Sequence, residues 1–143
     1  MNIREAKPED GAALQAINQE SLGYDYPLEK TKEQLNELLA VPDNKLLVCT
    51  MEEQVCGYIH AAVYETIYAP KMINILALSV ATAAQGAGCG KALMGAAEKW
   101  AVQLDAAGIR LNSGEERSAA HRFYEHIGFT KRKNQANYYK LFE

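Results

Sequence analysis

A glycine-rich turn is the segment whose residue types point most clearly to chemistry. It covers residues 80–91, Val-Ala-Thr-Ala-Ala-Gln-Gly-Ala-Gly-Cys-Gly-Lys, between a long apolar run and an amphipathic run. Glycine lets the backbone approach a ligand closely and adopt positive φ angles. A helix that begins after such a turn presents unpaired backbone N–H groups and the positive end of its dipole. The turn therefore predicts an anion site of the kind that typically holds phosphate.

Two common nucleotide-binding motifs do not fit this turn. A Walker A loop needs Ser or Thr after Gly-Lys, but position 92 holds Ala. A dinucleotide fingerprint would need Gly or Ala at position 91 or 93, which hold Lys and Leu. What remains is the pattern Gln85-x-x-Gly88-x-Gly90. Taken alone, this pattern also fits a glycine turn that only lets a helix pack on a strand.

A second segment of interest covers residues 117–129, Arg-Ser-Ala-Ala-His-Arg-Phe-Tyr-Glu-His-Ile-Gly-Phe. It predicts a helix over about 118–127 that ends at Gly128, because glycine commonly follows the last turn of a helix. The helix carries Tyr124, and His121 three residues earlier lies on a neighbouring face. A single histidine on a helix is usually structural, so Tyr124 is a more specific candidate for a chemical role than His121.

The two segments together resemble the GNAT acetyltransferase family. The first resembles the signature Q/R-x-x-G-x-G/A, which in that family cradles the pyrophosphate of coenzyme A, and the second resembles an A-x-x-x-Y helix ending in Gly-Phe. The motifs cover residues 72–129, and the expected order of elements is similar over the whole chain. The form Ala-His-x-Phe-Tyr preceded by Arg117 is similar to the small-molecule branch, which includes aminoalkylphosphonate and aminoglycoside 6′-N-acetyltransferases. Many members carry Asn at that Arg position, so an Asn contact to coenzyme A is not implied here.

The resemblance implies an acetyl-CoA-dependent N-acetyltransferase that moves acetyl to a primary amine of a small molecule by direct attack, without a metal. The backbone of Leu78 to Val80 would pair with the pantetheine arm, as an added strand does. The N–H of Leu78 would act catalytically by donating to the thioester oxygen. Tyr124 would be the acid that protonates the leaving thiolate. The implied cofactor-binding residues are Leu78, Ser79, Val80, Gln85, Gly86, Ala87, Gly88, Cys89, Gly90 and Lys91.

The general base is not evident from the sequence. Many family members place a Glu six residues before the Val80 position, where this chain has Asn74. The candidates that remain are Glu65 at the end of an expected strand, Glu20 near the end of the first helix, and His60. A chain of water molecules to bulk solvent fits equally well.

Several tyrosines are candidates for binding the acceptor amine. Tyr24, Tyr26, Tyr64 and Tyr68 gather in and near expected loops, and Asp25 stands beside the first two. Aromatic rings with an acidic neighbour suit a cationic amine. The same residues also fit an ordinary loop surface.

The composition limits which partners, cellular locations and cysteine-based sites are expected. The formal net charge is −3 and no Lys/Arg stripe is present, so nucleic acid is not expected as a partner. No apolar run approaches the length of a membrane span, and the N-terminus lacks the apolar stretch of a signal peptide, so a cytoplasmic location is expected. The three cysteines are odd in number and form no C-x-x-C pair, which argues against a disulfide framework or a zinc site. Cys49 and Cys56 are expected to be buried thiols.

The pattern of apolar residues predicts one domain over residues 1–143 with the order β-α-α-β-β-β-α-β-α-β-β. This is an α/β (α+β) layout in which helices flank a mixed, mostly antiparallel, GNAT-like central sheet. A hairpin tip is expected at Glu52 and Glu53, and Gly108 is expected to end the third long helix. The expected strands cover 2–6, 45–51, 54–65, 72–80, 109–113, 129–133 and 138–142, the last two forming a closing hairpin.

Two other functions stay open at this point. Acetylation of a protein N-terminus or lysine would need an open peptide groove beside residues 20–27. A coenzyme A-binding module without catalysis is suggested by the missing carboxylate at Asn74. Dimers are common in the family, which allows a homodimer.

Overall fold

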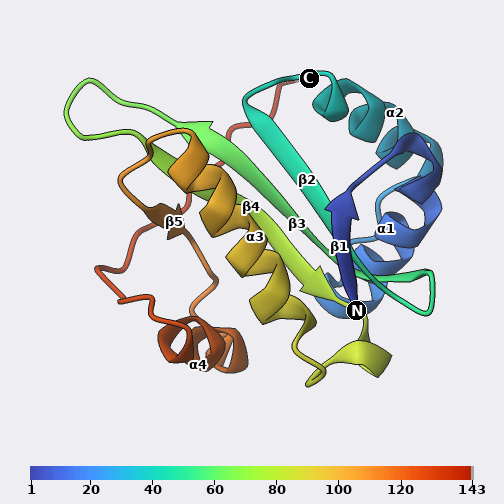
Figure 1. Cartoon of the computed structure of the whole chain (residues 1–143). Coiled ribbons are helices and arrows are strands. Elements are labelled where there is room, and N and C mark those ends of the chain that lie inside the picture. Colours follow the sequence, from blue (N-terminus) through green and yellow to red (C-terminus); the bar gives the residue numbers. More distant parts are fainter. Residues whose placement is uncertain (143) are drawn as a thin grey trace. The chain divides into compact units, whose positions relative to one another are not determined.

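The computed structural model describes residues 1–142 and is organised around a five-stranded sheet with the order β1-β2-β3-β4-β5 (Figure 1). Neighbouring strands are antiparallel except for β4 and β5, which are parallel. The expected mixed, mostly antiparallel sheet is therefore confirmed. The strands are β1 (Asn2–Glu5), β2 (Asn44–Met51), β3 (Gln54–Tyr64), β4 (Met72–Val80) and β5 (Ile109–Leu111).

Contacts divide the chain into two compact units. Residues 1–112 hold the whole sheet with helices α1 (Gly11–Ile17), α2 (Leu28–Leu39) and α3 (Cys89–Gln103). Residues from Ser113 on hold helix α4 (Ser118–His126). No helix within residues 1–142 is long and apolar enough to cross a membrane.

Alternation along the strands sends side chains to two faces of the sheet, and helices cover both. On one face, buried side chains of the strands form a cluster with α1 and α2, made of Ala6, Leu14, Ile17, Leu35, Leu46, Val48 and Tyr58. Helix α3 packs against β1 to β4 on the other face. Figure 1 shows it running alongside β4. The buried side chains of α3 are Cys89, Leu93, Met94, Ala97, Trp100 and Ala101.

A buried ion pair fixes the start of the first helix. Both Nη atoms of Arg4 on β1 donate to the carboxylate of Asp10, at 2.8 and 2.9 Å, and the N–H of Lys7 donates to it at 2.9 Å. Asp10 is only 5% exposed. The hydrogen bonds from Arg4 are the main cause that holds the pKa of Asp10 below its usual value. The pair therefore ties β1 to the 3₁₀ turn Pro8–Asp10 that leads into α1.

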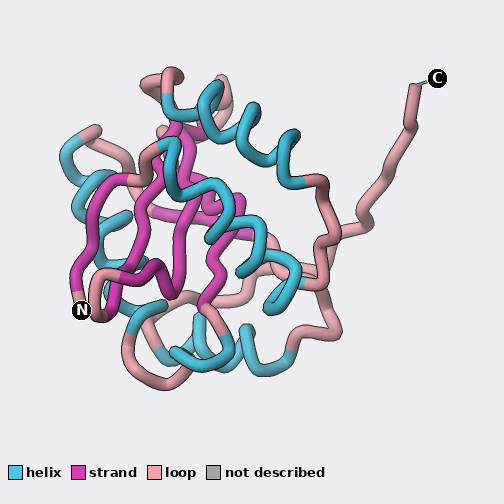
Figure 2. Tube along the Cα trace, turned by 90° about the vertical axis from the view of Figure 1, so that its right-hand side faces the viewer, coloured by secondary structure: helices cyan, strands magenta, loops and turns pink. Residues whose placement is uncertain are grey.

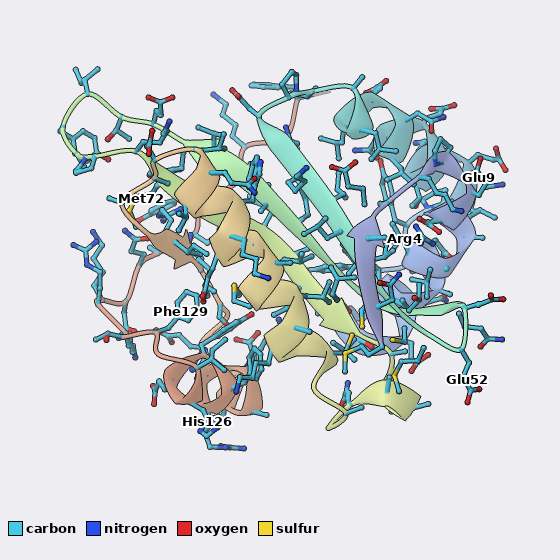
Figure 3. The ribbon with its side chains drawn as sticks, viewed as in Figure 1. Arg4, Glu9, Glu52, Met72, His126 and Phe129 are labelled. Atoms are coloured by element: carbon cyan, nitrogen blue, oxygen red, sulfur yellow. The ribbon has the colours of Figure 1, made fainter. Side chains whose placement is uncertain are left out.

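The β2–β3 hairpin turns at Glu52 and Glu53, as expected. Both residues have positive φ, at 52° and 67°, which matches the twist of a tight two-residue hairpin. Figure 3 shows Glu52 at the tip, pointing away from the sheet. The turn residues carry charge because they face solvent at the end of the strands.

The prediction that Gly108 ends α3 is wrong. The helix ends at Gln103, and the left-handed residue that follows it is Asp105, with φ of 56°. The N–H of Asp105 bonds to the carbonyl of Val102, and that of Ala106 to the carbonyl of Ala101. This is a Schellman cap, in which aspartate replaces the usual glycine because its short polar side chain tolerates the left-handed region.

The closing hairpin expected over 129–133 and 138–142 is also wrong. The structure forms no strand from residue 129 to 142 (Figure 2). The expected turn, Asn-Gln-Ala-Asn at 134–137, lacks the glycine that favours a tight hairpin. An isolated two-stranded hairpin is marginal in water, and the unit that holds this segment has no sheet to extend. The strand-like apolar side chains here are exposed by 89%, 86%, 85% and 91% at Tyr138, Tyr139, Leu141 and Phe142.

Replacing the buried carboxylate should destabilise the fold. Asp10→Ala is expected to lower the free energy of unfolding by about 2 kcal/mol at pH 7, because hydrogen bonds to a charged group are lost. Glu9→Ala is the matched control, since Glu9 is exposed and points away from β1 (Figure 3). Urea unfolding measures both variants, and equal stabilities would contradict this account.

The same pair predicts a pH dependence. The folded-state pKa of Asp10 lies below the ordinary value of 3.8, so its stabilisation is complete above about pH 4. It is lost as the pH falls through the lower, folded-state pKa. The stability difference between the natural chain and Asp10→Ala should therefore persist from pH 7 to 4 and shrink only below that.

Candidate active site

Strand β4 contains a bulge that changes its course. Along β3, His60 pairs with Ala77 but the next residue, Ala61, pairs with Ile75. Leu76 is therefore an extra residue on β4, and its side chain is 55% exposed. A bulge bends the strand and increases its local twist, and bulges are common next to active sites.

The pairing between β4 and β5 ends at this bulge. Strand β5 pairs only with Ile73, Asn74 and Ile75, and within residues 1–112 no strand pairs with residues 76–80 on that side. The far half of β4 thus presents an edge with backbone groups that no neighbouring strand occupies. An extended ligand can bond to such an edge as an added strand. Leu78 and Ser79 lie on this half.

The glycine turn has the predicted backbone geometry. Gly86 and Gly88 have φ angles of 85° and 90°, which other residues adopt only at a cost. Gly88 is the N-cap of α3, and no side chain caps the helix. Ala92 is the first residue whose N–H bonds back to the Gly88 carbonyl, so the N–H groups of residues 89–91 have no intrahelical partner. Unpaired N–H groups at the positive end of a helix dipole are able to bind an anion.

Contacts from the segment after α1 hold the turn in place. The chain makes a π-helical turn over Asn18–Leu22, and from it the Ser21 hydroxyl donates to the Val80 carbonyl at 2.7 Å. The Thr82 N–H donates to Glu20 Oε1 at 2.6 Å. The amide of Gln85 also donates to the Val80 carbonyl, at 3.3 Å. Sequence reasoning missed Ser21 and Thr82, because contacts between such distant segments leave no local pattern.

Two of the candidate bases, Glu20 and His60, already make hydrogen bonds within the protein. Hydrogen bonds from Thr82 lower the pKa of Glu20, so this carboxylate anchors the turn and is a weak proton acceptor. Burial lowers the pKa of His60, which is therefore neutral at pH 7, and its Nε2 donates to Asn44 Oδ1 at 2.6 Å. Both groups are engaged in structural hydrogen bonds.

Glu65 lies at the opposite end of β4 from the glycine turn. It is exposed and directly follows Tyr64, the β3 residue that pairs with Met72 at the start of β4. Leu78 is six residues further along β4, about 20 Å away at the usual rise per strand residue. The structure does not bring Glu65 and Leu78 together.

The candidate acceptor tyrosines fall into two groups. Tyr64 lies under the guanidinium of Arg110, whose Cζ is 4.3 Å from the ring centroid, and Arg110 Nη1 also donates to Asn74 Oδ1 at 2.7 Å. The ring of Tyr64 thus already faces a cation of the protein. Tyr24 and Tyr26 lie in the loop before α2, exposed by 63% and 46%.

Tyr58 is a residue near Tyr24 that sequence reasoning missed. Its hydroxyl donates to Asn18 Oδ1 at 2.6 Å, and it is 7% exposed. Burial raises the pKa of Tyr58, and the nearby hydroxyl of Tyr24 raises it further. Tyr58 and Tyr64 are six residues apart on β3, about 20 Å, so Tyr64 is remote from the Tyr24 group.

In the second unit, the end of α4 fixes the position of Tyr124. The Gly128 N–H bonds to the Glu125 carbonyl, and the Phe129 N–H bonds to the Tyr124 carbonyl. Gly128 has φ of 103°, and the rings of Phe129 and Tyr124 pack edge to face with centroids 5.8 Å apart. The Gly-Phe end of the motif is thus a Schellman cap with its hydrophobic contact. It holds the tyrosine ring from the side of the helix end.

The hydroxyl of Tyr124 remains a proton donor at neutral pH. Burial raises the pKa of Tyr124, and the positive charge of Arg117 lowers it only in part. A phenol with a pKa above 10 stays protonated until a strong base forms next to it.

Comparison with known sequences decides the family. The sequence profile of the Acetyltransferase (GNAT) family matches residues 12–129. The chain belongs to the GNAT acetyltransferase family. The match includes both the glycine turn and the Tyr124 helix, and it makes the protein an N-acetyltransferase by family. Among curated proteins, no sequence matches significantly.

Solved structures share the GNAT fold at low sequence identity. A transcriptional regulator from Bacillus halodurans C-125 is 22% identical, with a TM-score of 0.87 and coverage of 97% of this chain and 99% of that one. An aminoglycoside antibiotic 6′-N-acetyltransferase, AAC(6′)-IG from Acinetobacter haemolyticus, is 16% identical, with a TM-score of 0.86 and full coverage of both chains (100% and 100%). AAC(6′)-Iy in complex with a bisubstrate analogue of coenzyme A is 13% identical, with a TM-score of 0.86 and coverage of 98% and 97%.

One hollow of the described surface lies away from the glycine turn of this GNAT protein. It has a volume of about 200 Å³ and lies between the end of α2 and the start of β2. It is lined by Glu5, Leu39, Val41, Pro42, Asn44, Lys45 and Leu46. Because β2 starts at the opposite end of the sheet from Val80, this hollow takes no part in the site described above.

Two glycine substitutions should have opposite effects on stability. Gly86→Ala places a side chain at φ of 85° and should cost about 1–2 kcal/mol, although nothing lies within 4 Å of the added Cβ. Gly95→Ala, inside α3 and also with open space, should instead stabilise by up to about 1 kcal/mol through helix propensity. Urea unfolding of both variants checks the signs, and destabilisation by both would contradict the assigned backbone geometry.

Proposed function

We propose that this GNAT protein uses acetyl-CoA to acetylate a primary amine of a small molecule. The observation that carries the proposal is the geometry at the end of β4. There, the uncapped start of α3 after Gly88 follows directly on the unpaired half of the strand. An anion site next to a free strand edge matches a ligand that has a pyrophosphate followed by an amide-containing arm.

The proposed cofactor contacts follow from this geometry. The pyrophosphate accepts hydrogen bonds from backbone N–H groups of the turn and of the first residues of α3, with the exposed Lys91 adding positive charge. The pantetheine arm pairs with the free edge at Leu78 and Ser79. The Val80 carbonyl already accepts from Ser21 and Gln85, so it orders the turn more than it binds the arm.

The proposed reaction is a direct attack of the neutral amine on the thioester carbonyl. A new C–N bond forms while the carbonyl oxygen gains negative charge, which the Leu78 N–H stabilises. The C–S bond then breaks, and coenzyme A leaves as a thiolate. Tyr124 donates its proton to that sulfur.

Removal of the amine proton is assigned to water. Glu20 and His60 are held in structural hydrogen bonds, and Asn74, paired with Arg110, has no basic atom. An alkyl ammonium with a pKa near 10 loses its proton to solvent more readily as the pH rises. The rate should therefore increase from pH 7 to 9.

The acceptor is proposed to be a small amine because the fold neighbours include aminoglycoside 6′-N-acetyltransferases by name. The exposed Tyr24 and Tyr26, with Asp25 between them, offer aromatic faces and a negative charge to a cationic acceptor. The same loop would border a peptide groove, so peptides belong in the test.

The test measures free thiol release from acetyl-CoA with a panel of aminoalkylphosphonates, polyamines, aminoglycosides and amino-terminal peptides. Turnover with one class of small amine supports the proposal and identifies the acceptor. Turnover only with peptides would replace the small-amine acceptor by a protein. Tight coenzyme A binding without any turnover would favour a non-catalytic binding module.

Tyr124→Phe should lower kcat by about 100-fold or more while leaving the affinity for coenzyme A within a few fold, because only the proton donor is removed. Tyr138→Phe is the matched control, since that tyrosine is 89% exposed. Steady-state kinetics and equilibrium binding measure the two effects. An unchanged kcat would remove Tyr124 from the mechanism.

The pH profile gives a second readout for Tyr124. Because the pKa of Tyr124 lies above 10, deprotonation of its hydroxyl should reduce kcat only above pH 10. The Tyr124→Phe variant should lack this alkaline decline. A decline below pH 9 that survives the substitution would assign the titration to another group.

A further inference from the structure

The three cysteines, which are far apart in the sequence, meet at one place in the fold. Their sulfur atoms all lie within 4.8 Å of one another, and several sulfur atoms gather near the end of β4 in Figure 3. Cys49 comes from β2, Cys56 from β3 and Cys89 from the first turn of α3. They are 0%, 8% and 1% exposed, and all three are free thiols.

A second bulge turns Cys56 toward the other two thiols. Along β2, Cys49 pairs with Gly57 but Thr50 pairs with Val55, so Cys56 is an extra residue on β3. In a regular strand Cys56 would face away from Gly57. The bulge lets its sulfur reach the α3 face, where it lies 3.8 Å from the sulfur of Cys89.

Gly57 makes room for the third thiol. A Cβ added at this position would lie 2.7 Å from the sulfur of Cys89 and 3.0 Å from the Ser79 carbonyl. Gly57 pairs with Cys49 on one side and with Val80 on the other. The start of α3 can therefore approach the sheet closely enough for Cys89 to join the other two cysteines.

The spacing of these sulfur atoms suits a single metal ion. Metal–thiolate bonds of about 2.3 Å place ligand sulfurs about 4 Å apart around one ion. One pair here is already at 3.8 Å, and the whole group spans no more than 4.8 Å. Only small side-chain rotations are needed to bring all three to bonding distance.

The donor set selects a soft ion that accepts three ligands. Sulfur alone favours Cu(I), zinc or iron–sulfur clusters. Structural zinc requires four protein ligands and the iron–sulfur clusters require four cysteines, whereas this group within residues 1–142 has three sulfurs and no further His, Asp or Glu. We propose that Cys49, Cys56 and Cys89 form a buried site that binds one Cu(I) ion.

Access to the site is through the glycine turn. Residues 85–88 are exposed and Cys89 follows them directly, so opening the turn uncovers the sulfurs. Thiols bind metal as thiolates, so each ligand releases a proton to solvent as it binds. The bound ion would tie the first residue of α3 to β2 and β3. The backbone N–H of Cys89 also belongs to the proposed pyrophosphate site, so the two sites adjoin at the start of α3, but the Cu(I) site does not depend on the proposed acceptor.

The test titrates the full chain with Cu(I) under anaerobic, reducing conditions against a coloured Cu(I) chelator. The expected result is one Cu(I) per chain with three sulfur ligands by X-ray absorption, and weaker retention of Zn²⁺. Cys56→Ala and Cys89→Ala should each weaken Cu(I) binding by about 100-fold or more, since even lost supporting contacts cost 10–100-fold. Met72→Leu is the matched control, because this thioether lies at the start of β4, at the opposite end of the strand from Val80, whose partner Gly57 pairs with Cys49.

A further variant tests whether Cu(I) binding depends on the arrangement of the three sulfur atoms or only on the presence of three thiols. Gly57→Ala keeps all three cysteines but displaces the sulfur of Cys89, so it should also weaken Cu(I) binding. If that variant does not fold, the two cysteine variants, checked by urea unfolding, carry the test. The proposal is overturned by binding that is absent, by equal binding to the cysteine variants, by a preference for Zn²⁺, or by conversion of two thiols to a disulfide without retained copper.

Discussion

The change of partner along β4 is the constraint on which the site depends. β4 pairs with β3 over nearly its whole length, but with β5 only as far as Ile75. The bulge at Leu76 marks the boundary, so one strand is both a buried core element and, further along, a free edge. Backbone groups at an unpaired strand edge take their partners from water or from a ligand, and a ligand that runs along the strand can supply them. The core that holds β4 rigid therefore also positions the proposed cofactor arm.

The start of α3 has two different roles, one toward solvent and one toward the sheet. Outward, the N–H groups after Gly88 stay uncapped, which suits an anion. Inward, Cys89 packs under the helix against the sheet, in the space that Gly57 leaves. Ser21 and Glu20 hold the strand and turn from the other side. A rigid start of the helix keeps the donors in place before a ligand arrives, which reduces the entropy lost on binding.

The sequence was most informative where local chemistry determines the structure. The glycine turn and the Gly-Phe end of α4 follow from backbone preferences, and each was found as expected. The hairpin at Glu52 and Glu53, expected from a charged pair between two strand-like runs, was also found. The prediction that Gly108 ends α3 was wrong because Asp105, which comes earlier in the chain, adopts the left-handed conformation that ends the helix. The strand-like tail misled because propensity without a neighbouring strand does not make a sheet.

Features that depend on register were invisible in the sequence. The bulges at Leu76 and Cys56 insert a residue without any marker in its type, and the cysteines had seemed to be isolated buried thiols. The pairing of Asn74 with Arg110, and of His60 with Asn44, also required knowing which strands are neighbours. The acceptor residues follow even less from pattern, because loop residues are positioned by tertiary contacts.

Acetyl-CoA is proposed to bind in the turn before α3 and along the free edge of β4. Calorimetric titration with coenzyme A and with pantetheine checks this assignment, because pantetheine keeps the arm but lacks the pyrophosphate. Coenzyme A is expected to bind at least about 100-fold more tightly than pantetheine, since two or more charge-assisted hydrogen bonds are lost with the pyrophosphate. Equal affinity for the two compounds, or no binding of coenzyme A, would contradict this assignment.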